Sequence, residues 1–357
     1  MIDDNVIILG DYQEDYLIKF LNSYLENKNA SNFITRSTSF STLLKSDIDT
    51  DINLIDFRNS LFMSEKKTDL LEFYNSFENK EQIIEWMKNR PKGNTNLVEV
   101  EGSKNIVVVI PTMDSNSSLS QNVKYIYHNL QIIFVESGYN NKYFNYADSC
   151  NIGIKKASEY NPDWIIISND DMILKDGVEV LINEINKNNP NTYDVLYTLD
   201  SNYHSIPSYV CKLTPIFLFL QKIINPDYGN LLKKFEVNNG LIIETLFNKD
   251  NTFKKIKFSL LKNVLTKKVS ARFVLNGSFA IIGKNVFGQK SKLFDDTYIN
   301  HNEDVDLCLS LLNGKNRYNI INYDINEKVG TSLGYGEQRK LRGIIGDIYL
   351  FTKFKFD

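Results

Sequence analysis

An apolar run ends abruptly in polar residues within the segment "WIIISNDDMILKDG" (164–177). Asn169, Asp170 and Asp171 follow the run directly. Two adjacent carboxylates after a buried strand can hold a hard divalent cation through oxygen ligands, and such a cation would bridge phosphate oxygens. Polar residues end any strand, so a solvated strand end is the alternative for this segment taken alone.

A second group of acids, Glu303, Asp304 and Asp306, lies in the first turn of a helix expected over 303–314. The helix dipole favours acids there, and it stabilises the charged carboxylate, which would make it a weaker base. Several acids in one turn also repel each other, and such crowding is tolerated more readily where a function needs it. His301 lies beside this group, and the three histidines show no metal-ligand spacing.

A third candidate is the loop and basic stretch "KVGTSLGYGEQRKLRG" (328–343). Its glycines and hydroxyl residues would allow closure over a diphosphate, with Arg339, Lys340 or Arg342 neutralising charge. It lacks the Walker spacing and does not follow a strand, which disfavours phosphate-loop chemistry. A plain surface loop is the alternative.

Three apolar runs would position the first of these groups, at 105–112, 131–138 and 163–171. Expected helices separate them, and unalternating apolar runs of this kind indicate parallel strands covered on both faces. The carboxyl ends of parallel strands meet at one edge, where open α/β sheets bind ligands. The polar residues expected at that edge are Pro111, Thr112, Glu136, Ser137, Asn169, Asp170 and Asp171.

The chain is expected to form two domains, 1–100 and 103–357. In the second domain, residues 200–270 are expected to be an irregular, aromatic and lysine-rich insertion, after which a strand is expected at 273–283. The first hundred residues predict a small α/β unit with no catalytic motif, ending in the turn-rich linker "RPKGNTN". Its expected strands are in "NVIILG", "NFITR" and "INLIDF", and its expected helices cover 13–27, 68–77 and 81–89.

Composition narrows the class of protein. The 357 residues are 42% hydrophobic and 24% charged, as in a folded globular chain. A formal charge of -3 provides no basic field for nucleic acid. Cys150, Cys211 and Cys308 have no metal or redox spacing and suit a reducing compartment. The apolar segment at 214–220 is far too short to span a bilayer, so we expect a soluble, cytoplasmic protein.

Residues from about 105 to 350 resemble the inverting glycosyltransferases of family 2, rhamnosyltransferase-like, which have the GT-A fold. Several segments follow the order found in that family. They are "IVVVIPT", "IIFVESG", "NYADSCNIGIKKA", "WIIISNDDMIL", "LNGSFAIIGKNVF", "NEDVDLCLSLLNG" and "VGTSLGYGEQRKLR". The resemblance implies a Rossmann-like, mixed and mainly parallel sheet flanked by helices, and transfer of a sugar from a nucleotide-diphosphate donor to a hydroxyl acceptor with inversion.

The same resemblance implies roles for individual residues. Asp171 would bind Mn²⁺ or Mg²⁺, Asp304 would be the general base, and Glu303 would orient the acceptor. The donor would contact Pro111, Thr112, Glu136, Ser137, Asn151, Asn169 and Asp170, and the acceptor would contact Gly277, Ser278 and His301. The acceptor would be a glycan, lipid or protein, approached by the 200–270 insertion. The aromatic, basic tail (344–356) would either pack on the domain or touch a membrane.

Two other functions stay open at this point. A sugar-nucleotidyltransferase on a similar sheet would need a glycine-rich loop with Arg or Lys after the first strand, and "PTMDSNSSLS" (111–120) has neither feature. A carbohydrate- or nucleotide-binding protein without turnover is the other, because Asn169 stands where the family usually has Asp.

Overall fold

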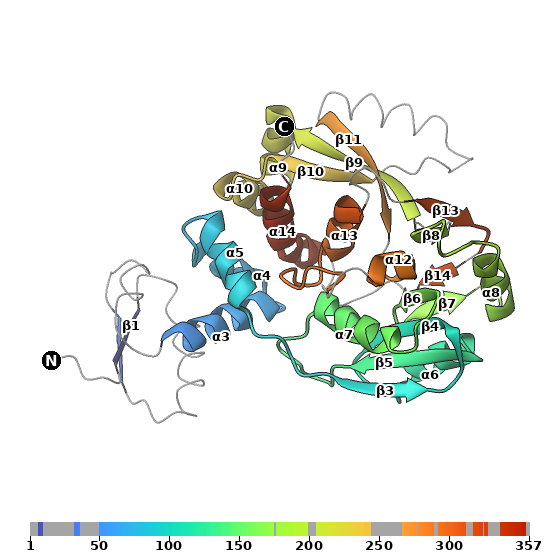
Figure 1. Ribbon diagram of the computed structural model, residues 1–357. Coiled ribbons are helices and arrows are strands. Elements are labelled where there is room, and N and C mark those ends of the chain that lie inside the picture. Colours follow the sequence, from blue (N-terminus) through green and yellow to red (C-terminus); the bar gives the residue numbers. More distant parts are fainter. Residues whose placement is uncertain are drawn as a thin grey trace. The chain divides into compact units, whose positions relative to one another are not determined.

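The chain divides into two compact units in a computed structural model, residues 1–61 and 62–357. The structure describes residues 6–9, 32–35, 50–174, 176–198, 205–243, 266–275, 277–288, 292–311, 317–323, 325–327 and 336–354. In the first unit, strands β1 (Val6–Leu9) and β2 (Asn32–Thr35) lie where the sequence predicts strands, and they pair in parallel (Figure 1).

Helix α3 (Thr50–Met63) replaces the strand expected in "INLIDF", which was wrong. The apolar residues of that window continue beyond it at helical spacing, from Leu54 and Ile55 to Leu61 and Phe62, so a six-residue window was too short to distinguish the two periods. The helix expected over 13–27 lies outside the described residues.

The second unit is built on a seven-stranded sheet (Figure 1). Five of its strands run in one direction and two, β12 and β3, run in the other, so three of the six neighbouring strand pairs are parallel and three are antiparallel. This confirms the expected mixed sheet. In spatial order the strands are β13 (Tyr318–Ile321), β8 (Val195–Thr198), β12 (Phe279–Gly283), β6 (Trp164–Ser168), β4 (Ser103–Thr112), β5 (Leu130–Glu136) and β3 (Asn96–Val100).

Helices cover both faces of this sheet, which explains why its central strands are apolar without alternation. Val109, Val135 and Ile167 pack on one face against α7 (Tyr146–Ser158) and α13 (Glu303–Leu311). Their neighbours on the same strands pack on the other face against α6 (Ser118–Ile126) and α8 (Val178–Asn186). Three of these helices, α6, α7 and α13, agree with the helices expected from the sequence.

The face of the sheet that α7 and α13 cover is tightly packed, as a glycine and two cysteines show. A Cβ on Gly153 of α7 would lie 2.3 Å from Cγ1 of Val109, so the helix can approach the sheet this closely only with glycine there. Cys150 and Cys308 are buried in the same core.

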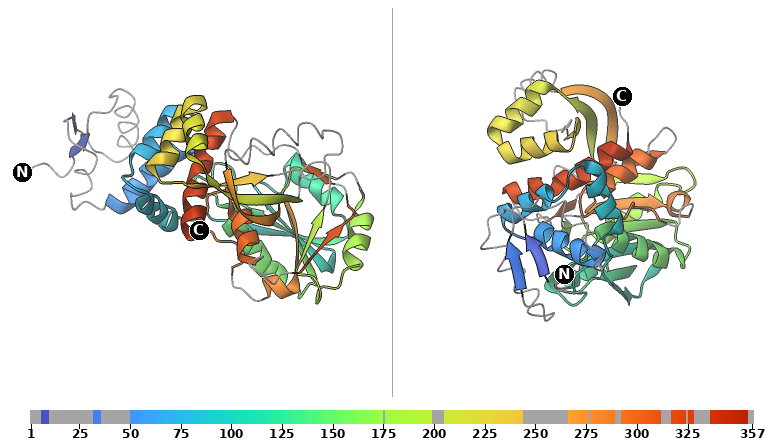
Figure 2. Two further views of the ribbon diagram at one scale, coloured as in Figure 1. Left: turned by 90° about the horizontal axis from the view of Figure 1, so that it is seen from above. Right: turned by 90° about the vertical axis from the view of Figure 1, so that its left-hand side faces the viewer.

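The expected irregular insertion over 200–270 was wrong for the residues that the structure describes there. They form an antiparallel sheet of β9 (Ser205–Leu213), β10 (Asn239–Ile243) and β11 (Thr266–Leu275), with helices α9 (Pro215–Ile224) and α10 (Pro226–Lys234). Each helix begins at a proline, the residue whose fixed φ suits the first helical position, and this signal was available in the sequence. Figure 2 shows the two helices side by side.

Within the second unit, helix α14 (Gly336–Lys353) packs against the helices that follow residue 62. It packs on α4 (Lys67–Asn75) and α5 (Lys80–Asn89), both of which the sequence predicts. The Tyr74 hydroxyl donates to the Leu341 carbonyl at 2.5 Å, and Arg342 donates to the Ser64 carbonyl at 2.6 Å. The two compact units divide after residue 61, and the domain boundary expected near residue 100 stays a prediction.

Two smaller features complete the described fold. Strand β14 (Ile325–Glu327) pairs antiparallel with β7 (Met172–Leu174), which directly follows the Asn169–Asp171 segment. In the part of the chain that the structure describes, no helix is both long and apolar enough to cross a bilayer.

Candidate functional site

Polar side chains from three neighbouring strands meet at the carboxyl edge of the sheet, as expected for parallel strands. Thr112 ends β4 and is paired in register with Glu136, which ends β5. The Thr112 hydroxyl donates to Oδ2 of Asp170, beyond the end of β6, at 2.6 Å. Oε1 of Glu136 accepts from both the backbone N–H (2.9 Å) and the hydroxyl (3.0 Å) of Ser115.

The segment after β6 is not a freely solvated strand end. Asn169, Asp170 and Asp171 are all partly buried, and the Asn169 N–H donates to the Ser278 carbonyl at 2.9 Å. Burial raises the pKa of Asp170, and the hydrogen bond from Thr112 acts in the opposite direction. The Asp170 carboxylate is thus held in place by the strand beside it rather than by solvent.

Two residues expected to contact a donor also hold the sheet edge together. Pro111 is buried inside β4 opposite Val135. The N–H and hydroxyl of Ser137 both donate to the Thr112 carbonyl, at 2.8 Å and 3.1 Å, and so close the turn after β5.

Glu303 and Asp304, at the start of α13, lie close to the residues that precede β12. β12 begins at Phe279, opposite Ser168 of β6. Just before it, the Gly277 N–H donates to Oδ2 of Asp304 at 3.0 Å, and the Val305 N–H donates to Oδ1 of Asp304 at 2.7 Å. The turn between β11 and β12 therefore contacts the strand-edge segment and the N-terminus of α13 at once.

Glu303 and Asp304 form an acid pair in which Glu303 is buried and Asp304 is partly buried. Glu303 is 7% exposed, and its Oε2 has no hydrogen-bond partner among the described residues. Burial, with the charge of Asp304 second, raises the pKa of Glu303 to about 8. Burial also raises the pKa of Asp304, although the N–H groups of Val305 and Gly277 act to lower it.

These directions correct one expectation from the sequence. The helix dipole alone would have lowered the pKa of both carboxyls, but their desolvation is the larger effect. A carboxylate with a raised pKa is a stronger base, so the position at the start of α13 does not weaken Asp304 for proton transfer.

His301 packs against α14 just before this acid pair. A Cβ on Gly343 would lie 3.0 Å from Nε2 of His301, so the ring occupies the space that the glycine leaves. The same Nε2 lies 3.9 Å from Oδ1 of Asp347, which also accepts from the Asn302 amide at 2.9 Å. His301 thus bridges the acid pair's helix and α14, and its charge, when present, lowers the pKa of Asp304.

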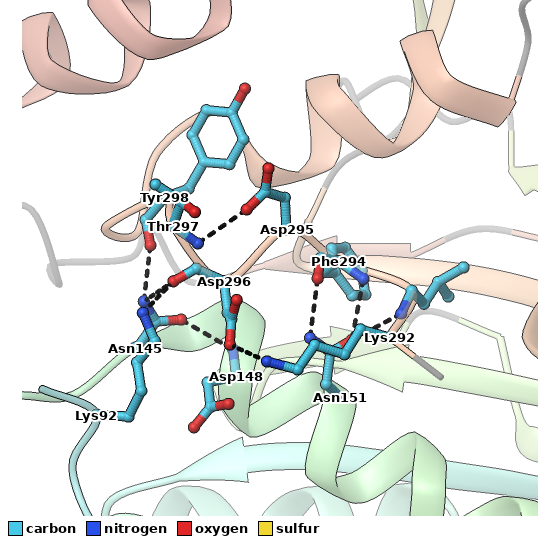
Figure 3. Close-up of polar contacts among 11 residues, drawn as sticks. Lys92, Asn145, Asp148, Asn151, Lys292, Phe294, Asp295, Asp296, Thr297 and Tyr298 are labelled. Carbon is cyan, nitrogen blue, oxygen red and sulfur yellow. Dashed lines mark hydrogen bonds and ion pairs between the residues drawn. The ribbon is translucent and has the colours of Figure 1, made fainter. Parts of the chain in front are cut away.

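A loop over residues 292–302 leads into α13, and α7 holds it (Figure 3). The Asn151 amide oxygen accepts from the N–H groups of Leu293 and Phe294, both at 2.9 Å, and its NH₂ donates to the Phe294 carbonyl at 2.9 Å. The Asn145 NH₂ donates to the Tyr298 carbonyl at 2.7 Å. Asn151, expected at the donor, therefore anchors the loop that positions the acid pair.

Asn145 and Tyr146 are the residues here that the sequence reasoning missed. The Asn145 side chain accepts from the Asp148 N–H at 2.8 Å and caps α7, and Asn followed three residues later by an acid is a readable cap signal. The Tyr146 hydroxyl donates to the Gly277 carbonyl, and no local pattern could have revealed a partner so distant in the sequence.

The residues at the strand edge limit the metal that would fit. Among the described residues, no three His, Cys, Asp or Glu side chains are grouped to hold an ion. Asp170 and Asp171 supply at most two adjacent carboxylates, which suits Mg²⁺ or Mn²⁺ taking its other oxygen ligands from phosphate and water. Arg342, expected near a diphosphate, is buried against Phe62 and Ser64, and residues 328–335 of the expected closing loop lie outside the described part.

Comparison with known proteins adds little to this geometry. No family model matches the chain, and no curated protein matches it. Among solved structures, A197 from STIV aligns with a TM-score of 0.33 and 12% sequence identity, over 63% of this chain and 86% of that chain. A likeness of this degree carries no argument about function.

Proposed function

We propose that the chain is an inverting glycosyltransferase of the GT-A type, which moves a sugar from a nucleoside-diphosphate donor to a hydroxyl acceptor. One observation carries the proposal: a hydrogen-bonded path links the polar strand ends to the acid pair of α13. It runs from Thr112 to Asp170, continues from Asn169 to Ser278, and ends with the contact between Gly277 and Asp304.

The strand edge would hold the donor. Glu136 and Thr112 would contact the nucleoside, since both project from adjacent strand ends where such ligands bind in α/β sheets. Asp171, with Asp170 beside it, would hold Mn²⁺ or Mg²⁺ against the diphosphate. The ion would supply neutralisation of the negative charge that grows on the leaving diphosphate.

The acid pair would activate the acceptor. Asp304 would take the proton of the acceptor hydroxyl, and its raised pKa makes it a better proton acceptor than an exposed carboxylate. Glu303, whose pKa is raised by burial and by the charge of Asp304, would donate a hydrogen bond to the acceptor in its protonated form. A base facing the donor from another element favours in-line displacement, which inverts the anomeric carbon.

The test is a thermal-shift panel of nucleotide sugars, with and without Mn²⁺ or Mg²⁺, followed by assays of sugar transfer and donor hydrolysis. A donor at about 100 times its Kd would stabilise the fold by about 2.7 kcal/mol. We expect Asp171→Ala to lose the metal-dependent part of that shift. We expect Asp304→Asn to keep the shift and to lose transfer by a factor of about 10² or more.

Asp163→Asn is the matched control, because Asp163 precedes the same strand β6 at the opposite edge of the sheet, where it pairs with Lys284 at 2.6 Å. It should leave nucleotide binding and transfer unchanged. If no nucleotide shifts the melting temperature, the proposed donor site is refuted. If Asp304→Asn retains transfer and hydrolysis, Asp304 is not the base.

A binding protein without turnover remains the second candidate. Two features favour it: Asn169 is uncharged, and Asp170 already accepts a short hydrogen bond from Thr112, so fewer carboxylate oxygens face a cation. A nucleotide-dependent thermal shift without transfer or hydrolysis would support this candidate. Release of diphosphate from a sugar phosphate and a nucleoside triphosphate would instead identify a nucleotidyltransferase.

A further inference from the structure

Helix α9 carries an exposed apolar face. Ile216, Phe219, Ile223 and Ile224 are 52%, 63%, 61% and 67% exposed. Their spacing of three, seven and eight residues from Ile216 places all four on one side of the helix. Four large apolar side chains adjoining one another at the surface are unusual on a soluble domain and mark an interaction site.

The opposite side of α9 is fixed by its neighbour α10. A Cβ on Gly229 of α10 would lie 2.7 Å from the backbone nitrogen of Lys222, so the two helices meet almost backbone to backbone. The turn between them is held by hydrogen bonds from Asn225 N–H to Gln221 (2.8 Å) and from Gly229 N–H to Asn225 (2.9 Å). With α9 locked in this way, its apolar face cannot turn inward.

The segment that contains α9 is strongly basic, although the whole chain is not. Residues 205–275 hold twelve Lys and Arg against four Asp and Glu, a formal charge of +8, which leaves -11 for the rest of a chain whose total is -3. Two of those four acids, Asp227 and Glu236, are paired with Lys67 (2.6 Å) and Lys80 (2.7 Å), which lie outside the segment. Their charges therefore do not offset the segment's lysines.

The aromatic C-terminal tail, the other segment with a similar composition, is not free for such a contact. Ile344, Ile345 and Ile348 of α14 are at most 1% exposed, and Tyr349 and Phe354 pack against the core beside α13. An apolar helix face within a basic segment is thus found at α9 rather than at the tail.

We propose that α9 is a membrane-docking element that lies in the surface of an anionic bilayer. The four apolar side chains would insert below the headgroups, and the net positive charge that the sequence gives this segment would favour an anionic lipid surface. This combination matches an interfacial helix, for which both apolar burial and attraction to anionic lipid contribute to binding. The proposal rests on this surface alone and does not depend on the proposed transferase activity.

The test is flotation of the full chain with phosphatidylcholine vesicles that contain or lack phosphatidylglycerol. We expect binding to the anionic vesicles, on the order of tenfold weaker binding to the neutral ones, and release at high salt. The double variant Phe219→Ser/Ile223→Ser should bind the anionic vesicles more weakly by a factor of about 10 or more, because it removes half of the inserted apolar side chains.

The matched control is Tyr125→Ser/Val180→Ser, which removes two exposed apolar side chains (79% and 41%) from helices outside the basic segment. It should bind vesicles as the wild type does. All four positions are exposed, so unchanged melting temperatures are expected and would show that each variant is folded.

Three results would overturn the proposal. In the first, the wild-type chain fails to float with anionic vesicles. In the second, the Phe219→Ser/Ile223→Ser variant floats as well as the wild type. In the third, neither protein binds vesicles, and size-exclusion chromatography shows a wild-type dimer that becomes a monomer in this variant; this result would assign the α9 face to a second copy of the chain.

Discussion

Replacing Glu303 by glutamine tests whether the Glu303–Asp304 acid pair is electrostatically strained. Glutamine keeps the size of the side chain and one acceptor oxygen, replaces the other oxygen by an NH₂ donor, and cannot ionise. The wild-type Glu303 has its pKa raised from 4.5 to about 8, so the folded protein keeps a proton that the unfolded chain releases. Its contribution to stability is therefore complete below pH 4.5 and is lost as the pH rises through about 8.

The size of the effect follows from that shift. One pKa unit corresponds to about 1.36 kcal/mol. Between about pH 6 and about pH 8, a single group with these two pKa values costs the folded state about 2 kcal/mol. The wild type should therefore lose about 2 kcal/mol of unfolding free energy between these two pH values because of Glu303. Glu303→Gln has no ionisable group there and should not show this loss.

The measurement is urea unfolding followed by circular dichroism at a series of pH values. The quantity compared is the difference in unfolding free energy between variant and wild type, since pH effects from other groups cancel in it. Asp304 is present in both proteins, so the difference reports Glu303 together with its effect on Asp304. Glu85→Gln, an exposed position on α5, is the control and should give a flat difference. Parallel curves for Glu303→Gln and the wild type would refute the raised pKa.

Two further predictions concern the residues that hold the site in place. Asn151→Ala should lower the free energy of unfolding by about 3 kcal/mol in urea, because it leaves three buried backbone groups without partners, whereas the exposed Asn116→Ala should change it by less than about 0.5 kcal/mol. Arg342→Met should lower the free energy of unfolding by about 2–3 kcal/mol by the same measurement, because the Arg342 guanidinium donates to buried carbonyls. Lys340→Met, on the exposed side of α14, is the control and should be nearly neutral. Equal effects at the two positions would contradict the stabilising role of the Arg342 hydrogen bonds.

The sheet and its polar edge were predictable from sequence because both depend on local patterns. The runs that became β4, β5 and β6 are apolar without alternation, and only strands covered on both faces need that composition. Their order along the chain places Thr112, Glu136 and Asp170 at one edge whatever the details of the packing. The strand expected in "INLIDF" failed because a six-residue window contains too little of either period to decide. The irregular structure expected over 200–270 failed for a different reason, because the prolines that begin α9 and α10 were not used as helix-start signals.

The roles of individual side chains were less predictable, because they depend on partners far along the chain. Asn151 has an amide that suits a ligand contact equally well, and only the approach of Leu293 and Phe294 shows where its hydrogen bonds go. Arg342 lies in a basic stretch, yet its partners are carbonyls near residue 63. The pKa directions at the start of α13 also required the fold, because burial depends on packing that the sequence does not display.

Two acids at opposite ends of one loop show that the strain at Glu303 is not forced by the architecture. Burial would raise the pKa of Asp295, but Lys353, Thr297 and Tyr349 surround its carboxylate with donors and lower its pKa to about 2. The same loop delivers Glu303 to a buried position where Oε2 has no partner among the described residues. Donors satisfy the carboxylate at one end of the loop, so the raised pKa of Glu303 at the other end comes from its own burial beside Asp304 and not from the loop as a whole. In the proposed function, this is the carboxyl that would contact the acceptor hydroxyl.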